Sequence, residues 1–87
     1  MIEPYEIFLR SEAIEALRGI RGAPRRVIAN FIDSLSMNPF LVGDYAIQNS
    51  SGRFICIKIL GYYAVTFWAD HPAKEIKIMD IRSADRA

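Results

Sequence analysis

The residues best suited to bind or transform a phosphate are cations and phenols in the C-terminal half of the chain. Lys58 stands alone among apolar residues in the segment 55–59, where a buried lysine without a partner is costly, so its side chain must reach solvent or a carboxylate. Gly61 then turns the chain and brings Tyr63 back beside Lys58 on the next strand. Arg82 lies near the end of the last strand. Lys58, Tyr63 and Arg82 are therefore the candidate catalytic residues, and we expect them on one face of a sheet.

These cations also have ordinary structural explanations. A lysine can snorkel from an exposed strand face to water. Arg82 can form a weak surface salt bridge with Asp80 or Asp85. Arg53 follows Gly52 at a turn, where a solvated arginine and a contact to a phosphate or to a partner's carboxylate are both reasonable. Sequence position alone leaves both explanations open.

Other reactive side chains give weaker signals. His71 is the only histidine, and it lies in the turn 70–72, where exposure to solvent is usual. Cys56 has no partner histidine in a recognisable motif, so we expect a buried structural thiol. Trp68 and Phe67 could stack on nucleic-acid bases, but aromatic residues within a strand more often belong to the core, where we place them. No metal-ligand spacing, glycine-rich phosphate loop or Ser-His-Asp pattern is present, so neither a metal nor a cofactor is predicted.

The length of 87 residues leaves room for a single domain, residues 1–87, with one core, and a hydrophobic fraction of 52% excludes disorder. The single cysteine excludes an intrachain disulfide, which fits a cytoplasmic location. The first residues lack the features of a secretory signal, and no apolar run approaches the roughly 18 residues of a membrane span, so no membrane contact is expected. Lysine and arginine nearly balance the acidic residues, but four arginines gather where the two predicted helices meet: Arg18, Arg21, Arg25 and Arg26. Solvated charges are the default explanation for that cluster, and a surface for phosphates is the alternative.

The spacing of apolar residues predicts the order β-α-α-β-β-β-β. A strand over 5–9 precedes a short helix that has Ser11 as its N-cap and ends by Gly22. A second helix is predicted from Pro24 to Met37, with its end at Asn38-Pro39. Its apolar face comprises Val27, Ile28, Phe31, Ile32 and Leu35.

The remaining strands are predicted over 45–48, 53–60, 62–69 and 75–82. The strand 62–69 has apolar residues in both alternating sets, so we expect both of its faces to be covered. The predicted fold class is α+β, with an N-terminal strand, a two-helix hairpin and then an antiparallel meander sheet.

Several short motifs follow one another in a recognisable order. Leu35-x-x-Asn38-Pro39 ends the second helix, and a glycine, Gly43, lies in the loop after it. The strand 54–59 then alternates apolar and basic residues, Gly61-Tyr62 opens the next strand, and the last strand leads into a basic tail at 82–86. In the order and spacing of these motifs the chain resembles the RelE/ParE superfamily, the small toxins of bacterial toxin–antitoxin pairs.

The resemblance implies a helical hairpin on one face of an antiparallel sheet, with a concave and cationic opposite face. RelE-like members cleave messenger RNA in the ribosomal decoding site, ParE-like members inhibit DNA gyrase, and an acidic antitoxin holds both kinds inactive. The expected partners are therefore an antitoxin, together with the ribosome and mRNA or with gyrase. A further alternative is a toxin-fold protein without nuclease activity that binds an antitoxin and helps to repress their operon.

For a metal-independent RelE-like nuclease, the chemistry requires a base for the 2′-hydroxyl, an acid for the leaving 5′-oxygen and cations that stabilise the phosphorane. The resemblance implies that Lys58 and Arg82 supply the positive charge and that Tyr63 stacks on a base or acts as the acid. The residues expected to bind RNA or the antitoxin are Arg53, Tyr62 and Arg86. The family usually has an arginine where this chain has Tyr63, and its loss removes one cation from the expected site.

Overall fold

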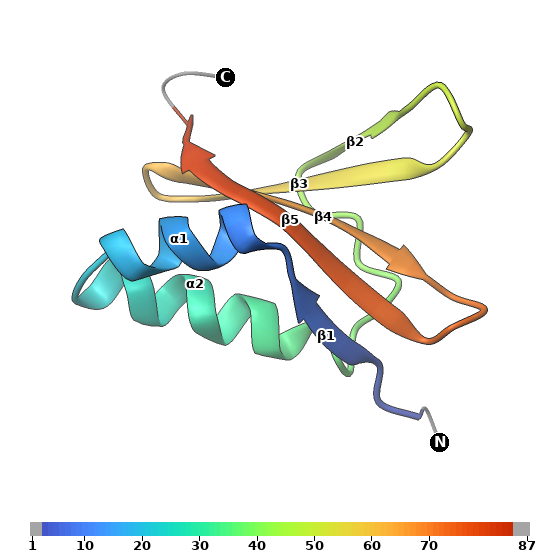
Figure 1. Cartoon of the computed structure of the whole chain (residues 1–87), viewed down its shortest axis with the longest axis horizontal. Coiled ribbons are helices and arrows are strands. Elements are labelled where there is room, and N and C mark those ends of the chain that lie inside the picture. The colour runs from blue at the N-terminus through green and yellow to red at the C-terminus, as the bar shows by residue number, and fades with distance from the viewer. Residues whose placement is uncertain (1–2, 85–87) are drawn as a thin grey trace.

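The structure, a computed structural model, describes residues 3–84. Its elements are β1 (Glu6–Leu9), α1 (Ser11–Gly19), α2 (Ala23–Ser34), β2 (Tyr45–Gln48), β3 (Phe54–Leu60), β4 (Tyr63–Asp70) and β5 (Glu75–Ser83) (Figure 1). This is the order that the apolar pattern predicts, and the α+β fold class is confirmed.

The five strands form one mixed sheet in the order β1-β5-β4-β3-β2. Strands β2 to β5 make the predicted antiparallel meander, and β1 pairs with β5 in parallel. A bulge between Thr66 and Phe67 shifts the register of β4 against β5. Because successive side chains of a strand point to opposite faces, such a shift changes which residues share a face.

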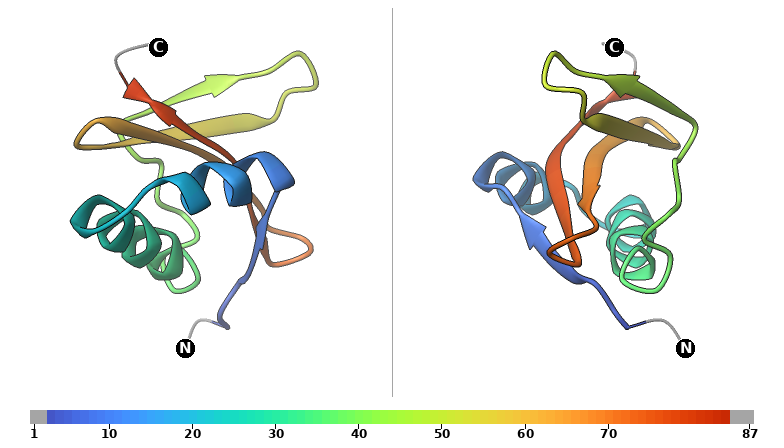
Figure 2. Two further views of the ribbon diagram at one scale, coloured as in Figure 1. Left: turned by 60° about the vertical axis from the view of Figure 1, so that its left-hand side comes forward. Right: turned by 90° about the vertical axis from the view of Figure 1, so that its right-hand side faces the viewer.

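Both helices contribute to one core on one face of the sheet, which we call the helix face (Figure 2). The buried members of this core are Tyr5, Ala13, Ile20, Ile28, Ile32, Leu35, Val65, Phe67, Ile76, Ile78 and Ile81. Phe31 packs edge-on against Phe67 with ring centroids 5.7 Å apart, which joins α2 to the middle of the sheet. We call the opposite side of the sheet the open face.

The start of α1 differs from the prediction. Arg10, and not Ser11, is the N-cap, and no side chain caps the helix. The reason is that the Ile14 N–H already donates to the Arg10 carbonyl, so the first helical hydrogen bond begins one residue earlier. Ser11 Oγ donates instead to the neighbouring Glu12 carboxylate at 3.2 Å.

The end of α2 also differs, because the helix stops at Ser34 and not at Met37. After Ser34 the N–H groups of residues 35–37 donate to carbonyls three positions back, which tightens the chain into turns. Within α2, Ile28 and Ile32 are buried as predicted, but Val27 is exposed because it lies beside the stripe that faces the core.

The two faces of β4 are not equally covered. Val65 and Phe67 are buried under the helices, whereas Thr66 and Trp68 are only half-buried on the open face. The expectation that Trp68 belongs to the core is therefore wrong, and the one for Phe67 is confirmed. Within residues 3–84, neither helix has the length and apolar character needed to cross a membrane.

Candidate functional site

The strand register separates the three candidate catalytic residues between the two faces of the sheet. Lys58 pairs with the buried Val65, and Leu60 pairs with Tyr63, so Lys58 and Tyr63 both belong to the helix face. Arg82 pairs with Ala64, the neighbour of Val65, and therefore belongs to the open face. The expectation that all three share one face is wrong, because adjacent residues of β4 point in opposite directions.

Lys58 meets a carboxylate, which is one of the two outcomes that its apolar surroundings allow. Its Nζ lies 3.7 Å from Asp44 Oδ1, and its side chain is 33% exposed. The other carboxylate oxygen of Asp44 accepts a hydrogen bond of 2.6 Å from the Ile59 N–H. This pair joins the loop before β2 to the middle of β3, so much of the positive charge of Lys58 is already compensated.

Arg82 lies on the open face with a side chain that is 74% exposed, and its guanidinium contacts Asp80 Oδ2 at 3.3 Å. Asp80 and Arg82, two apart on β5, do share one face, as the sequence predicts. Among residues 3–84, Asp80 Oδ1 is a buried side-chain atom that has no hydrogen-bond partner. An exposed guanidinium beside such a carboxylate can contact an incoming anion, but Asp80 weakens that attraction.

A hollow of about 340 Å³ on the open face adjoins Arg82 and Asp80. Its lining is mostly apolar and comprises Tyr45, Ile47, Ile55, Ile57, Ala64, Thr66, Asp80, Arg82 and Ser83. Arg82 is the one cation among these lining residues. The open face is thus less cationic around this hollow than the resemblance implies.

The residues expected to bind RNA or an antitoxin have separate positions. Arg53 stacks on Trp68, with its guanidinium carbon 3.7 Å from the ring centroid. Tyr62 is 76% exposed in the turn between β3 and β4. Arg86 lies outside the described residues.

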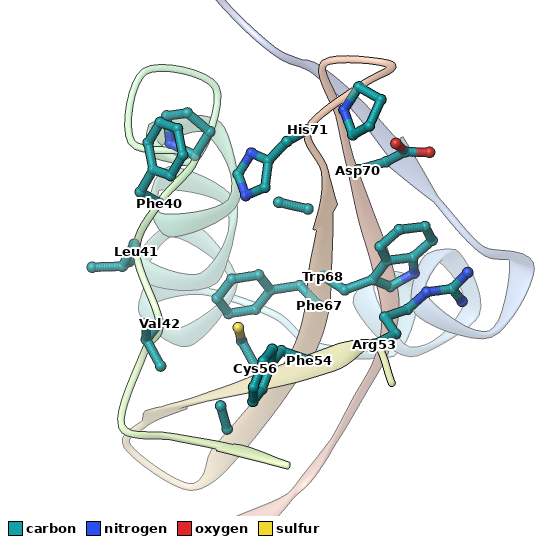
Figure 3. A pocket seen from close by; sticks show the side chains of 14 residues that line it. Phe40, Leu41, Val42, Arg53, Phe54, Cys56, Phe67, Trp68, Asp70 and His71 are labelled. Atoms are coloured by element: carbon teal, nitrogen blue, oxygen red, sulfur yellow. The ribbon is translucent and has the colours of Figure 1, made fainter. Parts of the chain in front are cut away.

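A second, larger hollow of about 550 Å³ lies between the loop after α2 and the strands β3 and β4 (Figure 3). Its lining includes Phe40, Leu41, Val42, Phe54, Cys56 and His71. This hollow is not predicted from the sequence, because the segment 40–44 has neither a helical nor a strand period. The available signal in the sequence was the run of three apolar residues, Phe40 to Val42, within a predicted loop.

His71 and Cys56 both take structural positions at this larger hollow. The His71 ring stacks on Phe40 at 4.6 Å, and its Nδ1 lies 2.9 Å from the Tyr5 hydroxyl, within hydrogen-bond distance. Burial raises the pKa of the Cys56 thiol, so the sulfur is a poor nucleophile near neutral pH. Among residues 3–84, no group of three or more His, Cys, Asp or Glu side chains could hold a metal ion.

Comparison with known proteins gives structural relatives only. No protein-family model and no curated protein matches the sequence. The fold is similar to that of a chain of the archaeal RelE–RelB complex from Pyrococcus horikoshii, with a TM-score of 0.81, 22% identity and coverage of 97% of this chain and 99% of that one. It is also similar to a chain of the RelBE2 toxin–antitoxin complex from Mycobacterium tuberculosis, with a TM-score of 0.76, 17% identity and coverage of 95% and 94%.

The isolated RelE toxin of E. coli is a third structural relative, with a TM-score of 0.66, 14% identity and coverage of 95% of this chain and 87% of that one. The three matches cover 95% to 97% of this chain and 87% to 99% of the other chains, so they take in nearly all of the helices and the sheet. The resemblance seen in the sequence motifs is therefore confirmed for the fold: this chain has the fold of the RelE toxins.

Proposed function

We propose that this chain is the toxin of a toxin–antitoxin pair and that a partner protein holds it inactive. The observation that carries the proposal is the match in fold, over 97% of this chain and 99% of the other, to a chain of a RelE–RelB complex. Two further complexes among the structural neighbours are also toxin–antitoxin assemblies, from M. tuberculosis and E. coli. The gyrase-inhibitor alternative gains no support from these neighbours, which are RelE structures.

The surface of the chain supports a protein partner. Large exposed apolar side chains line the two hollows, with Phe40, Val42 and Phe54 at the larger one and Tyr45 and Ile47 at the smaller one. Contiguous exposed apolar surface in a small protein typically marks an interaction site. The exposed guanidinium of Arg82 at the smaller hollow suits an acidic partner that folds as it binds.

Co-expression with the neighbouring gene tests this proposal. We expect the 87-residue chain to arrest growth alone, to be tolerated with its neighbour, and to be recovered with it through a tag on either protein. Ile47→Arg should weaken this recovery at least about tenfold, because it puts a charge into the apolar lining of the smaller hollow. Ile14→Arg, on the exposed side of α1, is the matched control and should change recovery little. Recovery of the chain alone, with a folded neighbour present, would contradict the proposal.

For the way in which the toxin acts, we propose ribosome-dependent cleavage of mRNA, with Arg82 as the cation that contacts the scissile phosphate. The favouring observation is the exposed guanidinium of Arg82 beside a hollow of the open face. Lys58 and Tyr63 lie on the other face, so they would reach the same phosphate only around the edge of the sheet. A single cation at the hollow supplies little affinity for free RNA, and the ribosome would have to position the message.

Single substitutions compare the two faces. Arg82→Ala is expected to reduce cleavage of translated mRNA by about 100-fold, because it removes the charge that stabilises the phosphorane. Lys77→Ala is the matched control, since Lys77 lies on the same face and is also paired with a carboxylate, that of Glu75 at 2.8 Å, but lies outside the hollow. Lys58→Ala should have a smaller effect than Arg82→Ala. Cleavage is measured by primer extension in a translating extract, and RNA without ribosomes should stay intact.

Three outcomes would contradict the proposal that the chain cleaves mRNA through Arg82. A larger loss in Lys58→Ala than in Arg82→Ala, with both variants folded, would place the chemistry on the helix face. Growth arrest that persists in a variant carrying both Lys58→Ala and Arg82→Ala would exclude both cations from the toxic activity. Inhibited DNA supercoiling with intact messages would support the gyrase alternative instead.

A further inference from the structure

The charge of this chain is distributed unevenly. Residues 16–32 contain four arginines and no acidic residue, whereas the remainder contains 7 lysines and arginines against 10 acidic residues. We call the surface formed by Arg18, Arg21, Arg25 and Arg26 the arginine tip. The tip is strongly positive, although the net charge of the chain is only +1.

The fold concentrates these arginines at one end of the molecule. Arg18 belongs to the last turn of α1, Arg21 to the connection, and Arg25 and Arg26 to the beginning of α2. All four are exposed. The α1–α2 connection forms the end of the helix layer, at the opposite side of the molecule from the β4–β5 turn (Figures 1 and 2). The tip is therefore a protruding surface that a large partner can reach.

Most of this charge is uncompensated, in contrast with the cations of the sheet. Arg18 pairs with Glu15 at 3.1 Å, but Arg21, Arg25 and Arg26 form no ion pair or side-chain hydrogen bond within residues 3–84. The first turn of α2 contains no acidic residue either. The cations elsewhere that do have carboxylate partners are Arg10, Lys58, Lys74, Lys77 and Arg82.

The chemistry of the tip favours phosphates over a protein surface. All four cations are arginines, whose planar guanidinium donates two parallel hydrogen bonds to a phosphate. No large apolar side chain is exposed between Arg18 and Arg26, because Ile20 is buried in the core, and the exposed apolar side chain next to the tip is that of Val27. A protein partner usually buries an apolar centre in its interface, whereas a nucleic-acid backbone is bound mainly through cations.

We propose that the arginine tip binds the phosphate backbone of a nucleic acid without reading its sequence. This inference goes beyond the proposed function, because binding at the tip requires neither an antitoxin nor cleavage. The tip belongs to the ends of α1 and α2 and their connection, whereas Arg82 belongs to β5 and the open face, so binding at the tip does not involve the candidate site. Binding of naked RNA without its cleavage is the combination that the two proposals predict together.

Fluorescence anisotropy with a labelled RNA hairpin and a labelled DNA duplex tests the proposal at low salt. The test variant is Arg21→Gln/Arg25→Gln/Arg26→Gln, which removes the three unpaired cations and keeps good helix formers. The control is Arg10→Gln/Lys74→Gln/Lys77→Gln, which lowers the net charge equally but removes paired cations. We expect the test variant to lose at least about tenfold in affinity, and the slope of log affinity against log salt to fall by about two to three units. The control should stay within about threefold of the parent.

Both RNA and DNA are included because they share the same phosphate chemistry. The one that binds with higher affinity is the nucleic acid that the tip prefers. Equal losses in the two triple variants would overturn the proposal, because they would show an effect of net charge alone. No binding by the parent chain would also overturn it, as would a tip that binds polyglutamate more tightly than either nucleic acid. Circular dichroism melts establish that both variants are folded, and no step of the test depends on toxicity.

Discussion

Phe67→Ala is expected to lower the free energy of unfolding by about 3–5 kcal/mol. Phe67 is 2% exposed, lies in the middle of β4 and packs edge-on against Phe31 of α2. Its removal leaves a cavity between the helices and the sheet and also ends an aromatic contact. Such a loss is a large part of the stability of a small domain, so the variant should melt at a much lower temperature or not fold.

Phe54→Ala is the matched control, because Phe54 is 61% exposed at the start of β3. Its effect on the free energy of unfolding should stay below about 1 kcal/mol. Urea denaturation followed by circular dichroism measures both variants. If Phe67→Ala does not fold, Phe67→Leu keeps part of the volume and should give a measurable intermediate loss. Equal effects of Phe67→Ala and Phe54→Ala would contradict the placement of the core.

Gly43→Ala is the second substitution with a large expected effect, about 2–4 kcal/mol in the free energy of unfolding. Gly43 has a φ of 85°, and an added Cβ would lie 2.7 Å from the Ile57 carbonyl oxygen. Any other residue here has to accept a left-handed backbone, at a cost of roughly 1–2 kcal/mol, and also has to push the loop away from β3. The same carbonyl accepts the Asp44 N–H at 2.8 Å, so the displacement would also loosen the Asp44–Lys58 pair.

Gly52→Ala separates the cost of the left-handed backbone from the cost of the close approach to β3. Gly52 has nearly the same φ, 86°, but an added Cβ there would meet only the Gln48 side chain, at an ordinary 3.8 Å. The Gly52 variant should therefore show the cost of the backbone conformation alone, and the difference between the variants reports the close approach of Gly43 to β3. Thermal and urea denaturation of the pair measure that difference. Equal destabilisation would mean that the loop can move away from Ile57 at no cost.

The order of helices and strands could be predicted from the sequence, since helix and strand periods depend on residues only a few positions apart. The strand 45–48 is observed as predicted, and the other boundaries of the sheet shift by one residue at most. The face of a strand on which each side chain lies relative to its neighbours could also be predicted, as for Asp80 and Arg82, which share one face. The end of α2 could not be predicted from the sequence, because the turns after Ser34 depend on how Leu35 packs into the core.

The candidate site could be predicted residue by residue, but its assembly could not. Lys58 was expected to need a carboxylate or solvent, yet the sequence does not show that Asp44 is that carboxylate. In the same way, the stacking of Arg53 on Trp68 and of Phe40 on His71 joins residues from separate segments. These contacts follow from the closure of loops and turns around the core, and no local pattern encodes them.

Helix and strand periods, the alternation along each strand and the concentration of arginine at the helix junction could all be predicted from the order of the residues alone. The parallel pairing of β1 with β5 and the placement of Lys58 and Arg82 on opposite faces follow from strand pairing in the folded chain. The physical reason is the register between strands. A shift of one residue moves every side chain of a strand to the other face, and this register is set by the bulge at Thr66 and Phe67 and by the burial of the whole core.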